Sequence, residues 1–386
     1  MQTINKRTQP DIRQIARLIP PSGNLVQGQN EVALYPELAR SLNEAVAAGL
    51  NSYSYAEGTD ELRRAVAEKV RLFNGVRVDA DKRPLELLIT HGATGGLVTF
   101  THKFLKDGAA VVFEPYYPYH KKTLENFNAR VEVVRLRGDE LALDTDELRR
   151  VCREATGRAE YPLRAIIACS PANPTGRVFT REELTSIVEI AAEFNLLILS
   201  DEVYEHFTVD SSDHIATASI EGAWERTITI SSFSKSWAIS GWRLGYLYGP
   251  GELVSQLAPL VNIYYVCSPT PLQHALARVL LANPEYYERL RKDFGRKRDM
   301  LTRALEVSGF KVYPSRSSFY AWARIPDRFD DAGELNEFLM KEAGVAGVPG
   351  SAFMDEPDPD IYMRLCFARE DDMLEAASDR IVKALA

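Results

Sequence analysis

The chain has 386 residues, a hydrophobic content of 45%, a charged content of 26% and a formal net charge of −8. This length favours two subdomains over a single core, and the negative charge gives no basis for nucleic-acid binding. No apolar run approaches the length of a membrane span and no apolar leader follows the first residues, so we expect a cytoplasmic protein without a membrane partner.

The cysteines and histidines show no spacing typical of a metal site. The four cysteines form no CxxC pair, and the six histidines form no HExxH-like pair. Cys169 and Cys366 lie in apolar runs, where buried and unreactive thiols are the usual finding. We therefore expect neither a disulfide framework nor a bound metal.

Short apolar runs alternate with amphipathic helical stretches through the middle of the chain. Uninterrupted apolar strands separated by helices are typical of a mostly parallel sheet that helices cover on both faces. The predicted strands are 87–90, 109–113, 130–136, 165–168, 196–199, 227–230 and 244–247, with helices that include 97–104 and 181–194. We therefore expect an α/β fold.

The pattern changes after about residue 275. A long charged helix is predicted at 284–308, and its basic run 292–297 is expected to form a solvated face. Shorter strands and helices are predicted at 310–313, 319–325, 332–342, 362–367 and the C-terminus. We expect a smaller α+β domain at 276–386, joined by an N-terminal segment at 1–45, beside a large domain at 46–275.

The most informative stretch is 231–235, Ser-Ser-Phe-Ser-Lys, which directly follows a predicted strand. The amine of Lys235 can form an imine with an aldehyde. The hydroxyls of Ser232 and Ser234 and the guanidinium of Arg243 can hold a phosphate. The alternative is a basic surface loop, so the neighbouring strands must supply the remaining partners of a phosphate-bearing aldehyde.

Further candidates follow two earlier strands, and ligands of open α/β sheets bind at the carboxyl ends of strands. Ala93 and Thr94 begin a helix whose backbone N–H groups would favour a phosphate, although a tight glycine turn explains the same residues. Tyr117 can stack on a pyridine ring, or it is an ordinary core or rim aromatic.

The next two strands end in polar residues. Asn173 can present its amide to a ring hydroxyl, whereas a plain Asn-Pro-Thr-Gly turn is the alternative. Asp201 ends a buried strand and needs a partner, either a protonated pyridine nitrogen or an arginine in a structural ion pair. Tyr204 can reach the same ring hydroxyl. Arg364 lies in an apolar strand, where a substrate carboxylate would pair with it.

With these residues in this order, the chain resembles the class I and II aminotransferases of fold type I, which use pyridoxal 5'-phosphate. The stretch 224–230 resembles the kynurenine aminotransferase/glutamine transaminase K branch. The resemblance covers essentially the whole chain. It implies a large domain with a mostly parallel mixed sheet, a smaller α+β domain, and a homodimer with active sites at its interface.

The resemblance also implies a role for each residue. Lys235 would form the internal aldimine and move the proton in the 1,3-shift. Asp201 would pair with the pyridine nitrogen, Asn173 and Tyr204 would hold the ring hydroxyl oxygen, and Tyr117 would stack on the ring. The phosphate would be held by Ala93, Thr94, Ser232, Ser234 and Arg243, with Tyr53 reaching over from the other subunit. The substrate would be bound by Gly28, Asn173 and Arg364.

Two segments depart from the family pattern. Residues 26–32 replace a Gly-x-Pro-x-Phe-like segment that lines the side-chain pocket in relatives, which leaves the substrate's identity open. Residues 317–320 replace a glycine-containing strand entry. Neither change touches a cofactor residue.

The motifs predict an aminotransferase that moves an amino group between an L-amino acid and a 2-oxo acid. The same residues also start β-elimination, cyclisation or oxidation, so a lyase, cyclase or oxidase with the same cofactor is the alternative. A third interpretation is a non-catalytic ligand sensor or scaffold. The intact Lys235 argues against it.

Overall fold

The computed structural model describes residues 12–209, 214–283, 285–355 and 360–386. The opening residues 1–11, where the sequence predicts no leader, and Pro284, the predicted first residue of the long helix, lie outside this part. Among the described residues, no helix is long and apolar enough to cross a membrane.

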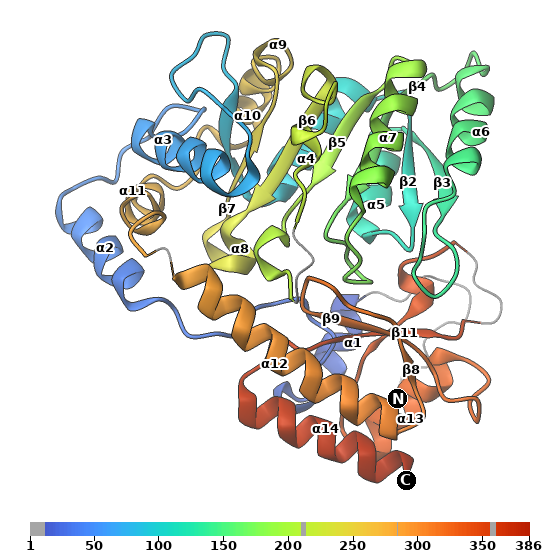
Figure 1. The fold of residues 1–386 in the computed structure, drawn as a ribbon. Coiled ribbons are helices and arrows are strands. Elements are labelled where there is room, and N and C mark those ends of the chain that lie inside the picture. The colour runs from blue at the N-terminus through green and yellow to red at the C-terminus, as the bar shows by residue number, and fades with distance from the viewer. Residues whose placement is uncertain (1–11, 210–213, 284, 356–359) are drawn as a thin grey trace.

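A seven-stranded sheet forms the upper part of the molecule in Figure 1, with the strand order β1-β7-β6-β5-β4-β2-β3. The neighbouring pairs β3–β2, β2–β4, β4–β5 and β5–β6 are parallel, which confirms the predicted sheet. Strand β7 runs antiparallel to both of its neighbours, β6 and β1. The segment 233–243 is too short for a parallel crossover, which takes about a dozen residues. The strands are β1 (Leu87–His91), β2 (Ala109–Glu114), β3 (Arg130–Arg135), β4 (Leu163–Cys169), β5 (Leu197–Asp201), β6 (Thr227–Ser232) and β7 (Leu244–Tyr248).

Helices cover both faces of this sheet because successive strand residues point to opposite sides. On β2, Val111 packs with helices α6 and α7, whereas Val112 packs with α4, α5, α9 and α10. Helices α3 and α11 cover β1 and β7. Their bounds are α3 (Asp60–Lys69), α4 (Gly92–Phe100), α5 (Pro118–Asn126), α6 (Thr145–Thr156), α7 (Arg181–Glu193), α8 (Phe233–Ser236), α9 (Gly251–Val254), α10 (Ala258–Tyr265) and α11 (Thr270–Val279).

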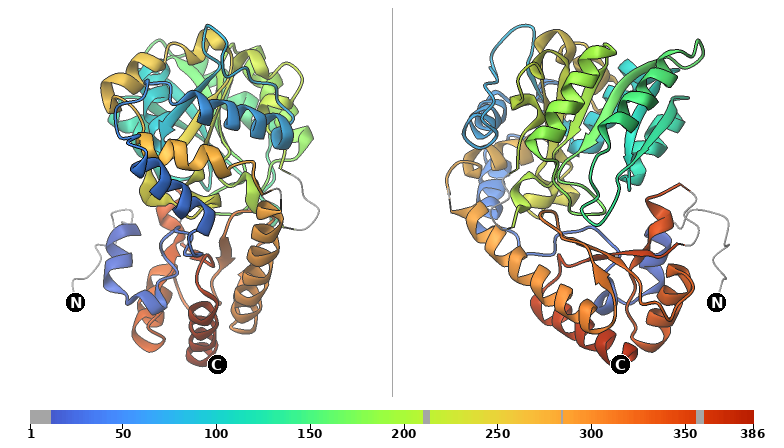
Figure 2. Two further views of the ribbon diagram at one scale, coloured as in Figure 1. Left: turned by 90° about the vertical axis from the view of Figure 1, so that its left-hand side faces the viewer. Right: turned by 45° about the vertical axis from the view of Figure 1, so that its right-hand side comes forward.

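A four-stranded antiparallel sheet with the order β10-β11-β9-β8 lies below the first sheet. Helices α12 and α14 lie side by side in Figures 1 and 2 and pack against it. The elements are α12 (Tyr286–Val307), β8 (Lys311–Val312), β9 (Tyr320–Arg324), α13 (Ala332–Glu342), β10 (Val348–Pro349), β11 (Tyr362–Cys366) and α14 (Asp371–Leu385).

Two details of this region correct the expectations from sequence. Lys297 does not belong to a solvated face: it is 4% exposed, and its ammonium donates to the carbonyl of Arg369, 2.7 Å away. The long helix packs against α14 along this side, so only part of its basic run faces solvent. Cys366 is buried as expected, whereas Cys169 is only half-buried because it lines the cavity described below.

The N-terminal segment links the two sheets. After α1 (Ile12–Leu18), the backbone of Leu25 pairs with Ala346 and Cys366 of the second sheet region. Helix α2 (Pro36–Ala47) instead packs on α11 beside the large sheet. Residues 26–30 therefore pass between the two regions and over the carboxyl ends of the strands. The division at residues 45 and 275 stays a prediction.

Candidate active site

A cavity of about 540 Å³ lies at the carboxyl ends of β1, β4, β5 and β6, between the two sheets. It is lined by the predicted residues Gly28, Ala93, Thr94, Tyr117, Asn173, Asp201, Tyr204, Ser232, Ser234, Lys235, Arg243 and Arg364. Tyr53 is not among the lining residues, and its side chain is 83% exposed. The structure therefore brings together every predicted site residue except the one expected to act across an interface.

Lys235 lies on the one-turn helix α8, directly after β6. Ser232 begins this turn, because its hydroxyl accepts a hydrogen bond from the backbone N–H of Ser234. The Nζ atom of Lys235 donates to the carbonyl of Gly28 at 2.5 Å. Burial lowers the pKa of Lys235 to about 8, since a desolvated ammonium is unfavourable. A substantial fraction of this amine is therefore neutral and nucleophilic near pH 8.

Donors for an anion converge at the start of α4. His91 precedes this helix without a side-chain cap, so the first N–H groups are left for other acceptors. Gly92 has a φ of +65°, and a Cβ there would lie 2.7 Å from Nη2 of Arg243. Arg243 itself is oriented by the carbonyls of Ser240 and His91, at 2.9 and 3.3 Å. This cradle requires glycine, and its donors suit a phosphate.

Asp201, at the end of β5, is 6% exposed, and its Oδ2 lies 2.8 Å from Nε2 of His120. Among the described residues the side chain that contacts this carboxylate is thus a histidine, not the arginine weighed from sequence. The ring of Tyr117 meets the His120 ring edge-on, with centroids 5.4 Å apart. His120 is not among the residues predicted from sequence, although its place three residues after Tyr117, on the first turn of α5, could have indicated it.

Arg364 on β11 is 2% exposed. Its Nη1 donates to Oδ1 of Asn173 at 2.9 Å, and its Nη2 donates to the carbonyl of Val26 at 2.6 Å. Its Nε is buried and has no hydrogen-bond partner in the described part of the chain. The rings of Tyr320 and Phe353 lie 4.3 and 4.8 Å from the guanidinium carbon. A carboxylate would complete this arrangement, because it accepts two parallel N–H donors.

Tyr204 follows β5, and its hydroxyl lies 3.0 Å from the hydroxyl of Tyr320 on β9. Burial raises the pKa of Tyr204 well above its ordinary value and that of Tyr320 to about 12. Both phenols therefore keep their protons across the physiological range. Residues 317–320 depart from the family pattern, but Tyr320 is not among the site residues predicted from sequence.

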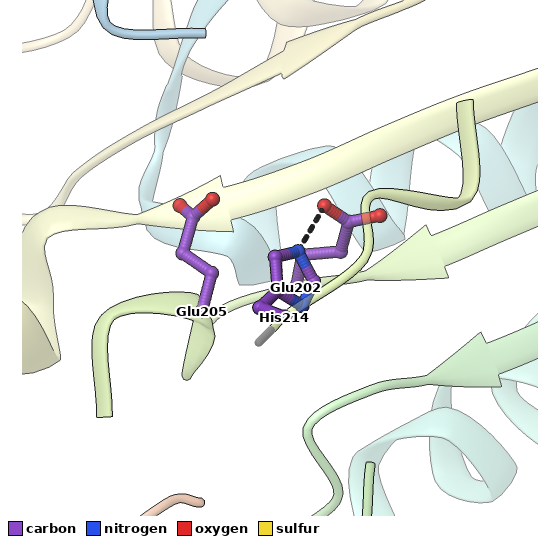
Figure 3. A group of neighbouring side chains, drawn as sticks. All are labelled: Glu202, Glu205 and His214. Atoms are coloured by element: carbon purple, nitrogen blue, oxygen red, sulfur yellow. Dashed lines mark hydrogen bonds and ion pairs between the residues drawn. The ribbon is translucent and has the colours of Figure 1, made fainter. Parts of the chain in front are cut away.

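A second polar cluster lies behind β5 and β6, where Glu202, Glu205 and His214 approach one another (Figure 3). Glu202 accepts from His214 at 2.9 Å, and Glu205 lies 2.7 Å from the ammonium of Lys69. Burial alone would raise the pKa of Glu205, but Lys69 and the nearby histidines reverse this effect and hold it below its ordinary range. The ammonium of Lys69 is thus the cation that pairs with Glu205, and we interpret the cluster as a buried ion pair that stabilises the fold.

The cavity residues fit pyridoxal phosphate. The cradle at Gly92 would take its phosphate, and the buried carboxylate of Asp201 would pair with a protonated ring nitrogen. Tyr117, Tyr204 and the amine of Lys235 line the cavity between this cradle and Asp201.

Known proteins resemble this chain over most of its length. The sequence model of the family "Aminotransferase class I and II" matches residues 22–381. The chain is 34% identical over 346 residues to an aspartate aminotransferase of Pyrococcus abyssi, covering 89% of this chain and 86% of that one. It is 29% identical to kynurenine–oxoglutarate transaminase 3 of Homo sapiens, with coverage of 95% and 85%.

Solved structures show the same fold. N-succinyldiaminopimelate aminotransferase of Mycobacterium tuberculosis superimposes with a TM-score of 0.89 at 32% identity, covering 97% of this chain and 96% of that one. A methionine aminotransferase of Escherichia coli gives a TM-score of 0.88 at 27% identity, with coverage of 99% and 100%. Members of this family use pyridoxal 5'-phosphate. The chain therefore belongs to the class I and II aminotransferases.

Proposed function

We propose that this chain transfers an amino group between an L-amino acid and a 2-oxo acid, with Lys235 as the residue that carries pyridoxal phosphate. The observation that supports this most directly is the grouping of a buried lysine amine, a buried carboxylate and a phosphate cradle in one cavity of about 540 Å³. Family membership agrees with this activity.

The cofactor residues have distinct tasks in this proposal. The residues that would hold the phosphate are Ala93, Thr94, Ser232, Ser234 and Arg243. Asp201, oriented by His120, would keep a proton on the ring nitrogen, and Tyr117 would lie against the ring. When bound there, pyridoxal phosphate supplies an electron-withdrawing ring that accepts the electron pair left at the substrate Cα.

The remaining residues handle the substrate and its proton. Arg364 binds the α-carboxylate through its fork, and its contact with Asn173 fixes the orientation of that fork. Lys235, as a neutral amine, would take the proton from the substrate Cα and return it to the cofactor carbon that is bonded to the same nitrogen. Its lowered pKa, about 8, suits this task because a general base works best near the ambient pH.

We also propose that the active enzyme is a homodimer. Tyr53 and Tyr55 are 83% and 74% exposed, and Ile263 and Val266 are 74% and 47% exposed. Exposed large apolar side chains of this kind are typical of surfaces covered by a partner. Tyr53 would then reach the phosphate of the neighbouring subunit. Sedimentation of the purified protein tests the dimer.

A cytoplasmic location is part of the same proposal. All four cysteines are free thiols in the structure, which suits a reducing compartment. Cell fractionation followed by immunodetection tests it, and recovery with an extracellular or membrane fraction contradicts it.

The decisive experiment incubates the pyridoxal phosphate-loaded enzyme with single amino acids and a mixture of 2-oxo acids. We expect a new amino acid to form without free ammonia. Ammonia without a new amino acid would overturn the proposal in favour of a lyase or oxidase. The Lys235→Ala variant serves as the control, and wild-type turnover by that variant would remove Lys235 from its assigned role.

A further inference from the structure

Tyr320 contacts Tyr204, but the proposed function gives Tyr320 no role in binding the cofactor or the substrate. Both side chains are buried, at 1% and 5% exposure, and their hydroxyl oxygens lie 3.0 Å apart. We propose that Tyr320 is a positioning residue, which acts by directing the hydroxyl proton of Tyr204 into the cavity. This inference rests on the proposed function, in which Tyr204 donates to the ring hydroxyl oxygen of pyridoxal phosphate.

The direction of the hydrogen bond follows from counting protons. Each phenol has one proton to donate and lone pairs to accept. A deprotonated ring oxygen can only accept, so Tyr204 must donate its single proton to it. The 3.0 Å contact can then persist only if Tyr320 donates and Tyr204 accepts. A chain of two hydrogen bonds results, in which each bond polarises the next and strengthens it.

The structure fixes the Tyr320 hydroxyl in place from several sides. The guanidinium of Arg364 stacks on its ring at 4.3 Å, and the Tyr204 ring meets it edge-on at 5.8 Å between centroids. Gly28 lies against the hydroxyl: a Cβ at residue 28 would be 1.8 Å from the Tyr320 oxygen and 2.9 Å from its Cζ. The guanidinium of Arg369 donates to the carbonyls of Gln27 and Gln29, at 2.7 and 2.9 Å, so residue 28 between them cannot move away freely.

The two unusual segments of the sequence thus interlock. The hydroxyl of Tyr320, in segment 317–320, fills the space left by the missing side chain of Gly28, in segment 26–32. The titratable and charged groups that influence the pKa values of the two phenols include Tyr117, Arg364, Cys366 and Arg369. None of them is removed by the substitutions proposed below.

The first test is the Tyr320→Phe variant, which keeps the ring against Arg364 and removes only the hydroxyl. The measured quantity is the pH midpoint of the visible absorbance change of the enzyme loaded with pyridoxal phosphate, without substrate. A weaker donor at the ring oxygen destabilises the form that carries negative charge there, so the midpoint rises. We expect a rise of about 0.1 to 0.7 pH unit, which corresponds to roughly a tenth to a third of the free energy of a hydrogen bond to a charged group.

Tyr362→Phe is the matched control, because Tyr362 lies on the neighbouring strand β11 and does not line the cavity. We expect no shift of its midpoint. The Michaelis constant for the amino acid should also stay near the wild-type value in Tyr320→Phe, because the ring beneath Arg364 remains. An unchanged midpoint in Tyr320→Phe would overturn the proposal.

The second test is a double-mutant cycle between Gly28→Ala and Tyr320→Phe, read as the dissociation constant of pyridoxal phosphate. Gly28→Ala alone should weaken cofactor binding, since the new Cβ meets the hydroxyl. Removing the hydroxyl should restore part of this loss, and strictly additive losses would contradict the interlock.

These readouts separate the inference from the proposed function. A shifted midpoint without amino-group transfer would contradict the proposed function and support the positioning role of Tyr320. Amino-group transfer without a shifted midpoint would support the proposed function and contradict the positioning role. A wild-type protein with no visible band after loading would overturn both.

Discussion

The proposed carboxylate site at Arg364 gives a prediction whose size follows from the structure. The Arg364→Lys variant keeps the positive charge but removes the planar fork of N–H donors. A lysine cannot donate to both Asn173 and Val26 and also form two hydrogen bonds to a carboxylate. A hydrogen bond to a charged group contributes about 1.5–3 kcal/mol. Losing one of them should lower kcat/KM for amino acids by about 10- to 200-fold.

The assay compares two substrates that differ only in the carboxylate. Rapid mixing of the loaded enzyme with an amino acid, and separately with the corresponding amine, follows the cofactor absorbance in a single half-reaction. The variant should be slowed with the amino acid and little changed with the amine, and it should retain its cofactor. Equal losses for both substrates, or release of the cofactor, would refute the placement of Arg364 at the substrate carboxylate.

Three further predictions concern buried groups. In the apoenzyme, the rate of pyridoxal phosphate capture should rise with pH and level off above about pH 8, because burial lowers the pKa of Lys235 from its ordinary 10.5 to about 8. A rate that levels off only near pH 10.5 would contradict this. Lys69→Met leaves Glu205 buried without its cation, so urea unfolding should show a loss of about 3–5 kcal/mol. That loss should grow from pH 5 to pH 8, because the unpaired carboxyl has a raised pKa in the folded state and is neutral only at lower pH; a pH-independent loss would argue against it. His120→Phe removes the partner of Asp201 and should weaken pyridoxal phosphate binding at least about 10-fold in an absorbance titration, whereas unchanged affinity would show that the contact is dispensable.

Much of the fold and the cofactor site was predictable from sequence because both depend on local patterns. Apolar runs and helical periodicity place strands and helices to within a few residues, as the agreement at β2 and α13 shows. In a parallel sheet, residues that follow different strands meet at one edge without further information. For this reason Lys235, Asp201 and Asn173 could be grouped before their distances were known.

The sequence by itself thus determined the class of sheet, the edge at which the site forms and the chemistry of its residues. The tertiary structure alone decided which side chains contact them. His120 reaches Asp201 across the sheet edge, and Tyr320 reaches Tyr204 only because the second sheet packs against the first. Such contacts join residues far apart in the chain, and no local pattern encodes the distance between them. The same packing explains why residue 28 must be glycine, a requirement set by a hydroxyl on β9 and not by its own neighbours.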